Sequence, residues 1–132
     1  QNIHCTIMAP AKLYYYASTG RGNAIRLSLA AAGIAFEDVC ATDFPPTAKD
    51  KELWTRIGGN TTTNIPMLVF PDEDKVYCQS RSVLEAIGRR ANLLGNINDD
   101  GESYMLSKIL SDAEDLRSAA YDSFGSWGAS RV

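Results

Sequence analysis

Two neighbouring pairs of residues in the middle of the chain have types and spacing suited to holding a ligand. Ile65-Pro66 directly precedes an apolar run, and a proline there marks a strand entry, a kink or a cis peptide bond. Gln79-Ser80 lies where a second apolar run gives way to a helical pattern, and the start of a helix attracts anions. Together these pairs predict a bent backbone edge beside an anion-binding helix start.

The element that must position both pairs is a β-hairpin. Two apolar runs, Met67 to Phe70 and Val76 to Cys78, flank the polar segment Pro71 to Lys75. Proline and aspartate are typical turn residues, so this pattern predicts two antiparallel strands joined by a short turn.

The N-terminal part predicts a strand–helix–strand unit. Lys12 to Tyr16 is rich in strand-forming residues, and a turn follows in which Ser18 or Thr19 can cap a helix. The helical pattern stops at Gly33, a common helix terminator, and Ala35 to Cys40 reads as a second strand. Two strands joined by one helix predict a parallel pair with a right-handed crossover.

The remaining elements are helical. Lys51 to Ile57 predicts a short helix that carries Trp54, and 82–94 predicts a longer one. Either a Ser82/Glu85 capping box or Ser80 is expected to cap the longer helix. A polar linker over 95–100 leads to a last helix, from Gly101 to about Ser118, capped by Asp99 or Asp100.

Composition narrows the classes of function. The net charge is −3 with no basic cluster, which argues against a nucleic-acid surface, and no apolar run has the length of a membrane span. Three dispersed cysteines and one histidine provide neither a zinc site nor a dithiol centre, so we expect no metal. An odd number of free cysteines fits the cytoplasm or another reducing compartment.

The order of elements and several short motifs resemble the cytosolic glutathione S-transferases of the tyrosine type, most nearly the sigma-like and pi-like classes. The motifs are the run from Lys12 to Arg26, then Trp54, Asn64-Ile65-Pro66, and Gln79-Ser80 followed by Val83-Leu84. The resemblance implies an α/β thioredoxin-like fold (βαβ-α-ββα, a four-stranded mixed sheet). Its expected bounds are an N-terminal extension over 1–10, a glutathione-binding domain over 11–94, and the start of an incomplete helical domain over 101–132.

The resemblance also implies a role for each site residue. Tyr15 matches the catalytic tyrosine whose hydroxyl donates to the glutathione sulfur, and Arg21 matches an arginine near that site. By the same resemblance, Trp54 contacts the glycyl end of glutathione. The backbone of Ile65, presented by the cis-proline Pro66, pairs with the cysteinyl unit. Gln79 and Ser80 hold the γ-glutamyl carboxylate.

Elementary chemistry supports the tyrosine assignment. A free thiol has a pKa of about 8.5, and lowering it by about two units requires about 2.7 kcal/mol of thiolate stabilisation. One hydroxyl donor together with a nearby helix N-terminus is of that size. A phenol stays protonated at neutral pH, so it can serve as that donor.

Plainer interpretations exist for the same residues. The three tyrosines from Tyr14 to Tyr16 are ordinary strand residues by propensity, although alternation turns Tyr15 away from its neighbours. Ser18 is a rival thiol donor, and Cys78 is expected to be a small buried apolar residue. Gly20-x-Gly22 imitates a dinucleotide-binding loop, but Ile25 occupies the position of its third glycine.

The function that the resemblance implies is detoxifying conjugation of the glutathione thiolate to a small electrophile by a homodimer. Only one convincing helix follows the linker, so most of a pocket for the electrophile would be absent and apolar faces would be exposed. The alternative function is therefore a catalytically silent, transferase-like interaction subunit of a larger heteromeric assembly.

Overall fold

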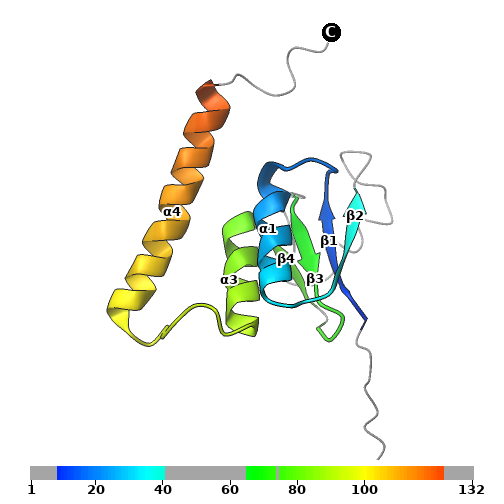
Figure 1. Cartoon of the computed structure of the whole chain (residues 1–132), viewed down its shortest axis with the longest axis horizontal. Coiled ribbons are helices and arrows are strands. Elements are labelled where there is room, and N and C mark those ends of the chain that lie inside the picture. The colour runs from blue at the N-terminus through cyan, green and yellow to red at the C-terminus, as the bar shows by residue number, and fades with distance from the viewer. Residues whose placement is uncertain (1–8, 41–64, 74, 124–132) are drawn as a thin grey trace, which may run out of the picture. The chain divides into compact units, whose positions relative to one another are not determined.

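The computed structural model describes residues 9–40, 65–73 and 75–123. Its elements are β1 (Ala11–Tyr15), α1 (Gly20–Ala31), β2 (Phe36–Cys40), β3 (Met67–Val69), β4 (Val76–Cys78), α3 (Ser80–Arg90) and α4 (Asp100–Ser123) (Figure 1). The chain divides into two compact units between Leu93 and Leu94. The short helix expected around Trp54 lies outside the described residues.

The four strands form one mixed sheet in the order β2-β1-β3-β4. β1 and β2 are parallel, with α1 between them in the chain, and this confirms the predicted strand–helix–strand unit. β3 pairs with both β1 and β4 in antiparallel fashion, so the predicted hairpin is also present.

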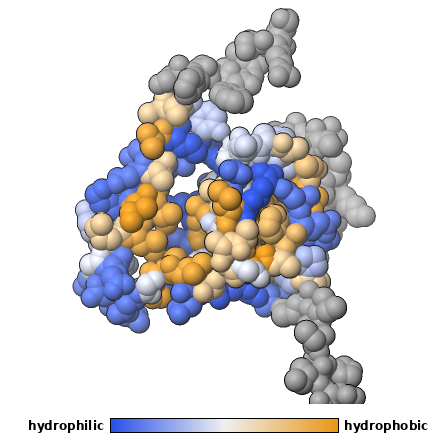
Figure 2. All heavy atoms as spheres, in the orientation of Figure 1, coloured by the Kyte–Doolittle hydropathy of each residue, from blue (hydrophilic) through white to orange (hydrophobic). Residues whose placement is uncertain are grey.

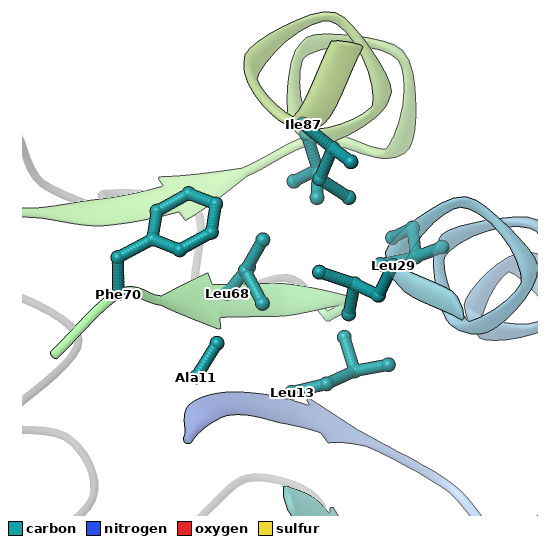
Figure 3. Packing of buried hydrophobic residues seen from close by; sticks show 8 residues of the cluster. Ala11, Leu13, Leu29, Leu68, Phe70 and Ile87 are labelled. Atoms are coloured by element: carbon teal, nitrogen blue, oxygen red, sulfur yellow. The ribbon is translucent and has the colours of Figure 1, made fainter. Parts of the chain in front are cut away.

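Helices α1 and α3 pack on one face of this sheet (Figure 3). Strand β1 alternates, with Ala11, Leu13 and Tyr15 buried and Lys12 exposed, because successive side chains point to opposite faces. The main core comprises side chains from both helices and both central strands: Ala11, Leu13, Ile25, Leu29, Leu68, Phe70, Val83 and Ile87. This core fixes the start of each helix relative to the ends of the strands.

A smaller apolar cluster forms around Met67 and Val76. Tyr14, Ile65 and Val69 pack against it. Tyr14 is therefore a packing residue of the sheet, while its neighbour Tyr15 points toward the helices, as the alternation of a strand requires.

Helices α1 and α3 end in the same backbone arrangement. Gly33 has φ +66° after α1, as its sequence position predicts, and Asn92 has φ 55° after α3. In each case the next residue donates its N–H back into the last turn, from Ile34 to Leu29 and from Leu93 to Gly88. The helix predicted over 82–94 therefore ends earlier, because Asn92 adopts the left-handed conformation.

The last helix, α4, is longer than predicted and begins at Asp100. The side chain of Asp99 accepts a hydrogen bond from the backbone nitrogen of Glu102 at 2.9 Å, and Glu102 accepts one from the backbone nitrogen of Asn96 at 2.6 Å. Asp99 is thus the cap. Large apolar side chains along α4 are exposed, namely Tyr104, Met105, Ile109 and Leu116, and apolar surface is visible along this helix in Figure 2.

Candidate active site

The register of the strands aligns three of the predicted site residues at one end of the sheet. Tyr14 is opposite Met67, and Met67 is opposite Cys78. Tyr15 follows Tyr14, Pro66 precedes Met67 and Gln79 follows Cys78, so these three residues lie directly beyond the last antiparallel row of β1, β3 and β4. The fold therefore gathers residues from three separate stretches of sequence at one end of the sheet, which we call the site edge.

Tyr15 joins this edge to the start of α1. Its side chain is largely buried, and its hydroxyl oxygen accepts a hydrogen bond from the backbone nitrogen of Arg21 at 2.9 Å. Thr19 occupies the N-cap position of α1 but makes no side-chain capping bond. The prediction of a Ser18 or Thr19 side-chain cap is therefore wrong, because the Tyr15 hydroxyl satisfies one of the first N–H groups of the helix instead.

Two glycines make room for the Tyr15 ring. A Cβ atom at Gly22 would lie 2.3 Å from Cδ1 and 2.6 Å from Cγ of Tyr15, and one at Gly20 would lie 2.4 Å from its hydroxyl oxygen. Gly20 also has φ +23°, outside the usual range for other residues. The glycine pattern that imitated a dinucleotide loop thus accommodates an aromatic ring.

The second part of the edge is the entrance to β3. The Ile65–Pro66 peptide bond is cis, one of the two geometries expected from the sequence. Pro66 is buried, and Ile65 is half-buried against the Met67 cluster. The backbone here lies next to the end of β1 in the sheet.

The third part is the start of α3. Gln79 has φ 68° and ψ 115°, makes no side-chain capping bond, and leads directly into the first helical residue, Ser80. A non-glycine residue in this region costs of order 1–3 kcal/mol, and such strain clusters at functional sites. Ser80 is the first helical residue and not the residue before the helix, so the predicted Ser80 cap is not formed.

Glu85 does not reach back to Ser82 as the capping box requires. It accepts a hydrogen bond from Nε of Arg81 at 3.2 Å, one helical turn away. Because the helix begins two residues earlier than predicted, Ser82 lies inside its first turn. No acidic residue lies in the first turn of α3. The partial positive charge at the start of this helix therefore stays available to an anion.

Arg26 is a further residue of this region, and no sequence motif assigns it a role. Its Nε lies 2.5 Å from Oδ2 of Asp38, while Nη1 and Nη2 donate to the backbone oxygens of Ser18 and Tyr16 at 2.8 and 2.9 Å. The hydrogen bond to Asp38 raises the pKa of the Arg26 guanidinium, so it stays charged. No local pattern announces this pair, because it joins α1 to β2 across the crossover.

The remaining candidate residues are not part of this set of Tyr15, Pro66 and Gln79. Arg21 is exposed on the first turn of α1, while Trp54 lies outside the described residues. Ser18 is exposed, and its described contact is through its backbone oxygen. Burial raises the pKa of the Cys78 thiol, which makes Cys78 a poor nucleophile.

Within residues 9–40, 65–73 and 75–123, no group of three histidine, cysteine or acidic side chains is placed to hold a metal ion. In the same residues, no helix is both long enough and apolar enough to cross a bilayer.

Comparison with known proteins identifies the family of this chain. The family model of the glutathione S-transferase N-terminal domain matches residues 10–89, which is more than half of the chain. The chain therefore belongs to the glutathione S-transferase family.

One relative and two solved structures show how far the similarity extends. The class-mu 28 kDa glutathione S-transferase isozyme of Schistosoma japonicum is 32% identical over 110 residues, which cover 81% of this chain and 49% of that protein. The sigma-class transferase of Fasciola hepatica has a TM-score of 0.59 at 26% identity, over 81% of this chain and 48% of that structure. A Caenorhabditis elegans transferase has a TM-score of 0.62 at 24% identity, over 84% and 49%.

These matches also define the extent of the similarity. The chain spans about half the length of the relatives that it matches. The shared part contains the mixed four-stranded sheet and the start of a helical domain, which is the thioredoxin-like transferase fold expected from the sequence.

Proposed function

We propose that this chain binds reduced glutathione at the sheet edge formed by Tyr15, Pro66 and Gln79, and that the Tyr15 hydroxyl stabilises the thiolate. The observation that carries the proposal is the 2.9 Å hydrogen bond from the Arg21 amide to the Tyr15 hydroxyl oxygen. A phenol has one proton to donate, and a bond accepted by its oxygen leaves that proton available for a sulfur.

This arrangement is suited to stabilising a thiolate. A hydroxyl that accepts a hydrogen bond becomes a stronger donor through mutual polarisation, and the start of α1 adds a partial positive charge. A hydrogen bond to a charged group contributes about 1.5–3 kcal/mol. Together these terms are comparable with the roughly 2.7 kcal/mol that a two-unit decrease in thiol pKa requires.

The other residues would hold the tripeptide. Ile65 would pair its backbone with the cysteinyl unit beside Pro66, in the manner of strand addition. Gln79 and Ser80 would hold the γ-glutamyl carboxylate at the start of α3, where an anion is favoured. Arg21 and Trp54 are proposed as further contacts from the family resemblance.

The reaction follows from these contacts. The glutathione thiol loses its proton to solvent, and the thiolate forms a carbon–sulfur bond with the electrophile. A leaving group departs with its electron pair, or a double bond is saturated and takes up a proton. We also propose that the chain forms a homodimer. The cytoplasm or another reducing compartment would suit the free thiols of Cys40 and Cys78.

The decisive experiment is the Tyr15→Phe variant, with Tyr104→Phe as the matched control on exposed surface. We expect Tyr15→Phe to retain binding to a glutathione resin but to raise the pH midpoint of thiolate absorbance by more than about one unit. Conjugation of a chromogenic aryl halide should fall at least tenfold. An unchanged midpoint and unchanged turnover in Tyr15→Phe would remove Tyr15 from the mechanism.

A second function is favoured by the exposed apolar side chains of α4. Four large side chains, Tyr104, Met105, Ile109 and Leu116, are between 51% and 74% exposed. Such exposed apolar surface is suited to contact with another protein, so the alternative is an interaction subunit without catalysis. Retention on a glutathione resin with a compact homodimer favours the enzyme, whereas no retention and a stable heteromeric complex favour the subunit. Retention without turnover would indicate a domain that binds glutathione but does not catalyse.

A further inference from the structure

The side chain of Arg26 joins β2 to the loop that follows β1. Four hydrogen bonds surround its guanidinium: Nε and Nη2 contact the two carboxylate oxygens of Asp38 at 2.5 and 3.2 Å, and Nη1 and Nη2 contact the backbone oxygens of Ser18 and Tyr16. The side chain is only 19% exposed. A guanidinium that makes four hydrogen bonds is more restrained than a solvated surface charge.

The two carbonyl groups that Arg26 holds belong to the loop that decides the geometry of Tyr15. This loop runs from the end of β1 to the start of α1, and therefore sets the position of the Arg21 amide relative to the Tyr15 hydroxyl. The guanidinium carbon of Arg26 also lies 5.7 Å from the centre of the Tyr15 ring, within the range of a cation–π contact.

We propose that Arg26, oriented by Asp38, is a positioning residue that holds the Tyr15 hydroxyl at the Arg21 amide and so controls how strongly the site stabilises a thiolate. Its effect on the thiolate rests on the proposed function. Its effect on the Tyr15–Arg21 hydrogen bond does not, and can be measured without any ligand.

Geometry and charge can be separated by substitution. Lysine keeps the positive charge of Arg26 but lacks the planar fork that reaches two carbonyls and one carboxylate together. Asp38→Asn keeps the size of the side chain but removes the charge that orients the guanidinium. If position matters, both Arg26→Lys and Asp38→Asn should disturb Tyr15, although only the second changes a formal charge.

Arg90→Lys is a matched control in the same unit. Arg90 also bridges a helix to acidic side chains, with Nη1 2.7 Å from Oε1 of Glu73 and a second bond to Asp72. It is 29% exposed, and it joins the end of α3 to the turn between β3 and β4, at the opposite end of β3 from Pro66. Its replacement tests whether loss of any such ion pair affects Tyr15.

The first measurement is amide hydrogen exchange in the unliganded chain. We expect Arg26→Lys and Asp38→Asn to increase exchange of the Arg21 amide about tenfold relative to the Leu29 amide, which lies in the middle of α1, while Arg90→Lys leaves that ratio unchanged. If Arg26→Lys or Asp38→Asn folds and shows the same exchange ratio of the Arg21 and Leu29 amides as wild type, the proposal is overturned.

The second measurement is the pH midpoint of thiolate absorbance in the glutathione-bound chain. Arg26→Lys should raise this midpoint by about 0.5 unit, the size of one interaction with a helix terminus, and Arg90→Lys should not. If wild type forms the thiolate and Arg26→Lys leaves the midpoint unchanged, the positioning role is wrong. If wild type forms no thiolate, the proposed function fails, and the exchange ratio still decides whether Arg26 positions Tyr15.

Discussion

The ring of Tyr15 occupies the space that a side chain at Gly22 would need, since a Cβ atom there would lie 2.6 Å from Cγ of Tyr15. Cγ is close to the backbone of β1, so a small rotation of the ring cannot relieve that contact. The residue that we propose as the thiolate donor is therefore coupled to the backbone of the helix that supports it.

This relationship predicts the sign of a substitution. In an exposed helix, Gly→Ala stabilises by up to about 1 kcal/mol, but Gly22→Ala should destabilise by about 1–3 kcal/mol because it forces Tyr15 out of place. Urea unfolding measures the change. Stabilisation of the Gly22→Ala variant would contradict the packing of Tyr15 against α1.

The cap of α4 gives a second prediction. Asp99→Ala should cost about 1 kcal/mol of helix stability, because the amide of Glu102 loses its acceptor, whereas Asp99→Ser should restore most of it. Asp100→Ala is the control, since Asp100 is already inside the helix. Thermal unfolding followed by circular dichroism measures the stability of each variant. A larger loss of stability in Asp100→Ala than in Asp99→Ala would show that Asp100, not Asp99, is the cap.

The hairpin predicts a dependence of stability on alkaline pH. The Tyr77 hydroxyl donates to Glu73 at 2.5 Å, and this hydrogen bond, followed by burial, raises the pKa of Tyr77 from 10.0 to about 12. Between these values the unfolded chain has lost the phenol proton while the folded chain keeps it. The stabilising contribution is therefore complete below pH 10 and is lost as the pH rises toward 12.

Tyr77→Phe should remove this contribution. Its melting temperature should fall less than that of wild type between pH 9 and about pH 11, where the two states bind different numbers of protons. Tyr104→Phe, on the exposed surface of α4, should behave as wild type. Parallel curves for wild type and Tyr77→Phe would show that Glu73 does not hold the phenol proton in the folded chain.

The exposed side chains of α4 predict self-association or partner binding. Replacing Ile109 and Leu116, which are 59% and 74% exposed, by glutamine should reduce the apparent mass in sedimentation without reducing retention on a glutathione resin. Lys108→Gln, also on α4, is a control for a polar change. An unchanged mass distribution would show that this face makes no contact in solution.

The elements whose residues repeat at a clear period were predictable because local sequence alone decides them. Alternation along β1 separates Tyr15 from Tyr14, and Gly33 ends α1 where expected. The start of α3 was not predictable in the same way, since Gln79 is held at φ 68° by the surrounding fold and three serine or glutamate signals compete nearby.

The sequence by itself determined the family fold, the parallel pair and the hairpin, because short-range patterns and motifs specify these features. Only the tertiary structure decided that the Tyr15 hydroxyl satisfies an amide of α1 and that Arg26 reaches Asp38 on β2. Both contacts join elements brought together by the crossover and the sheet register. Their partners depend on distances that no local pattern of residues encodes.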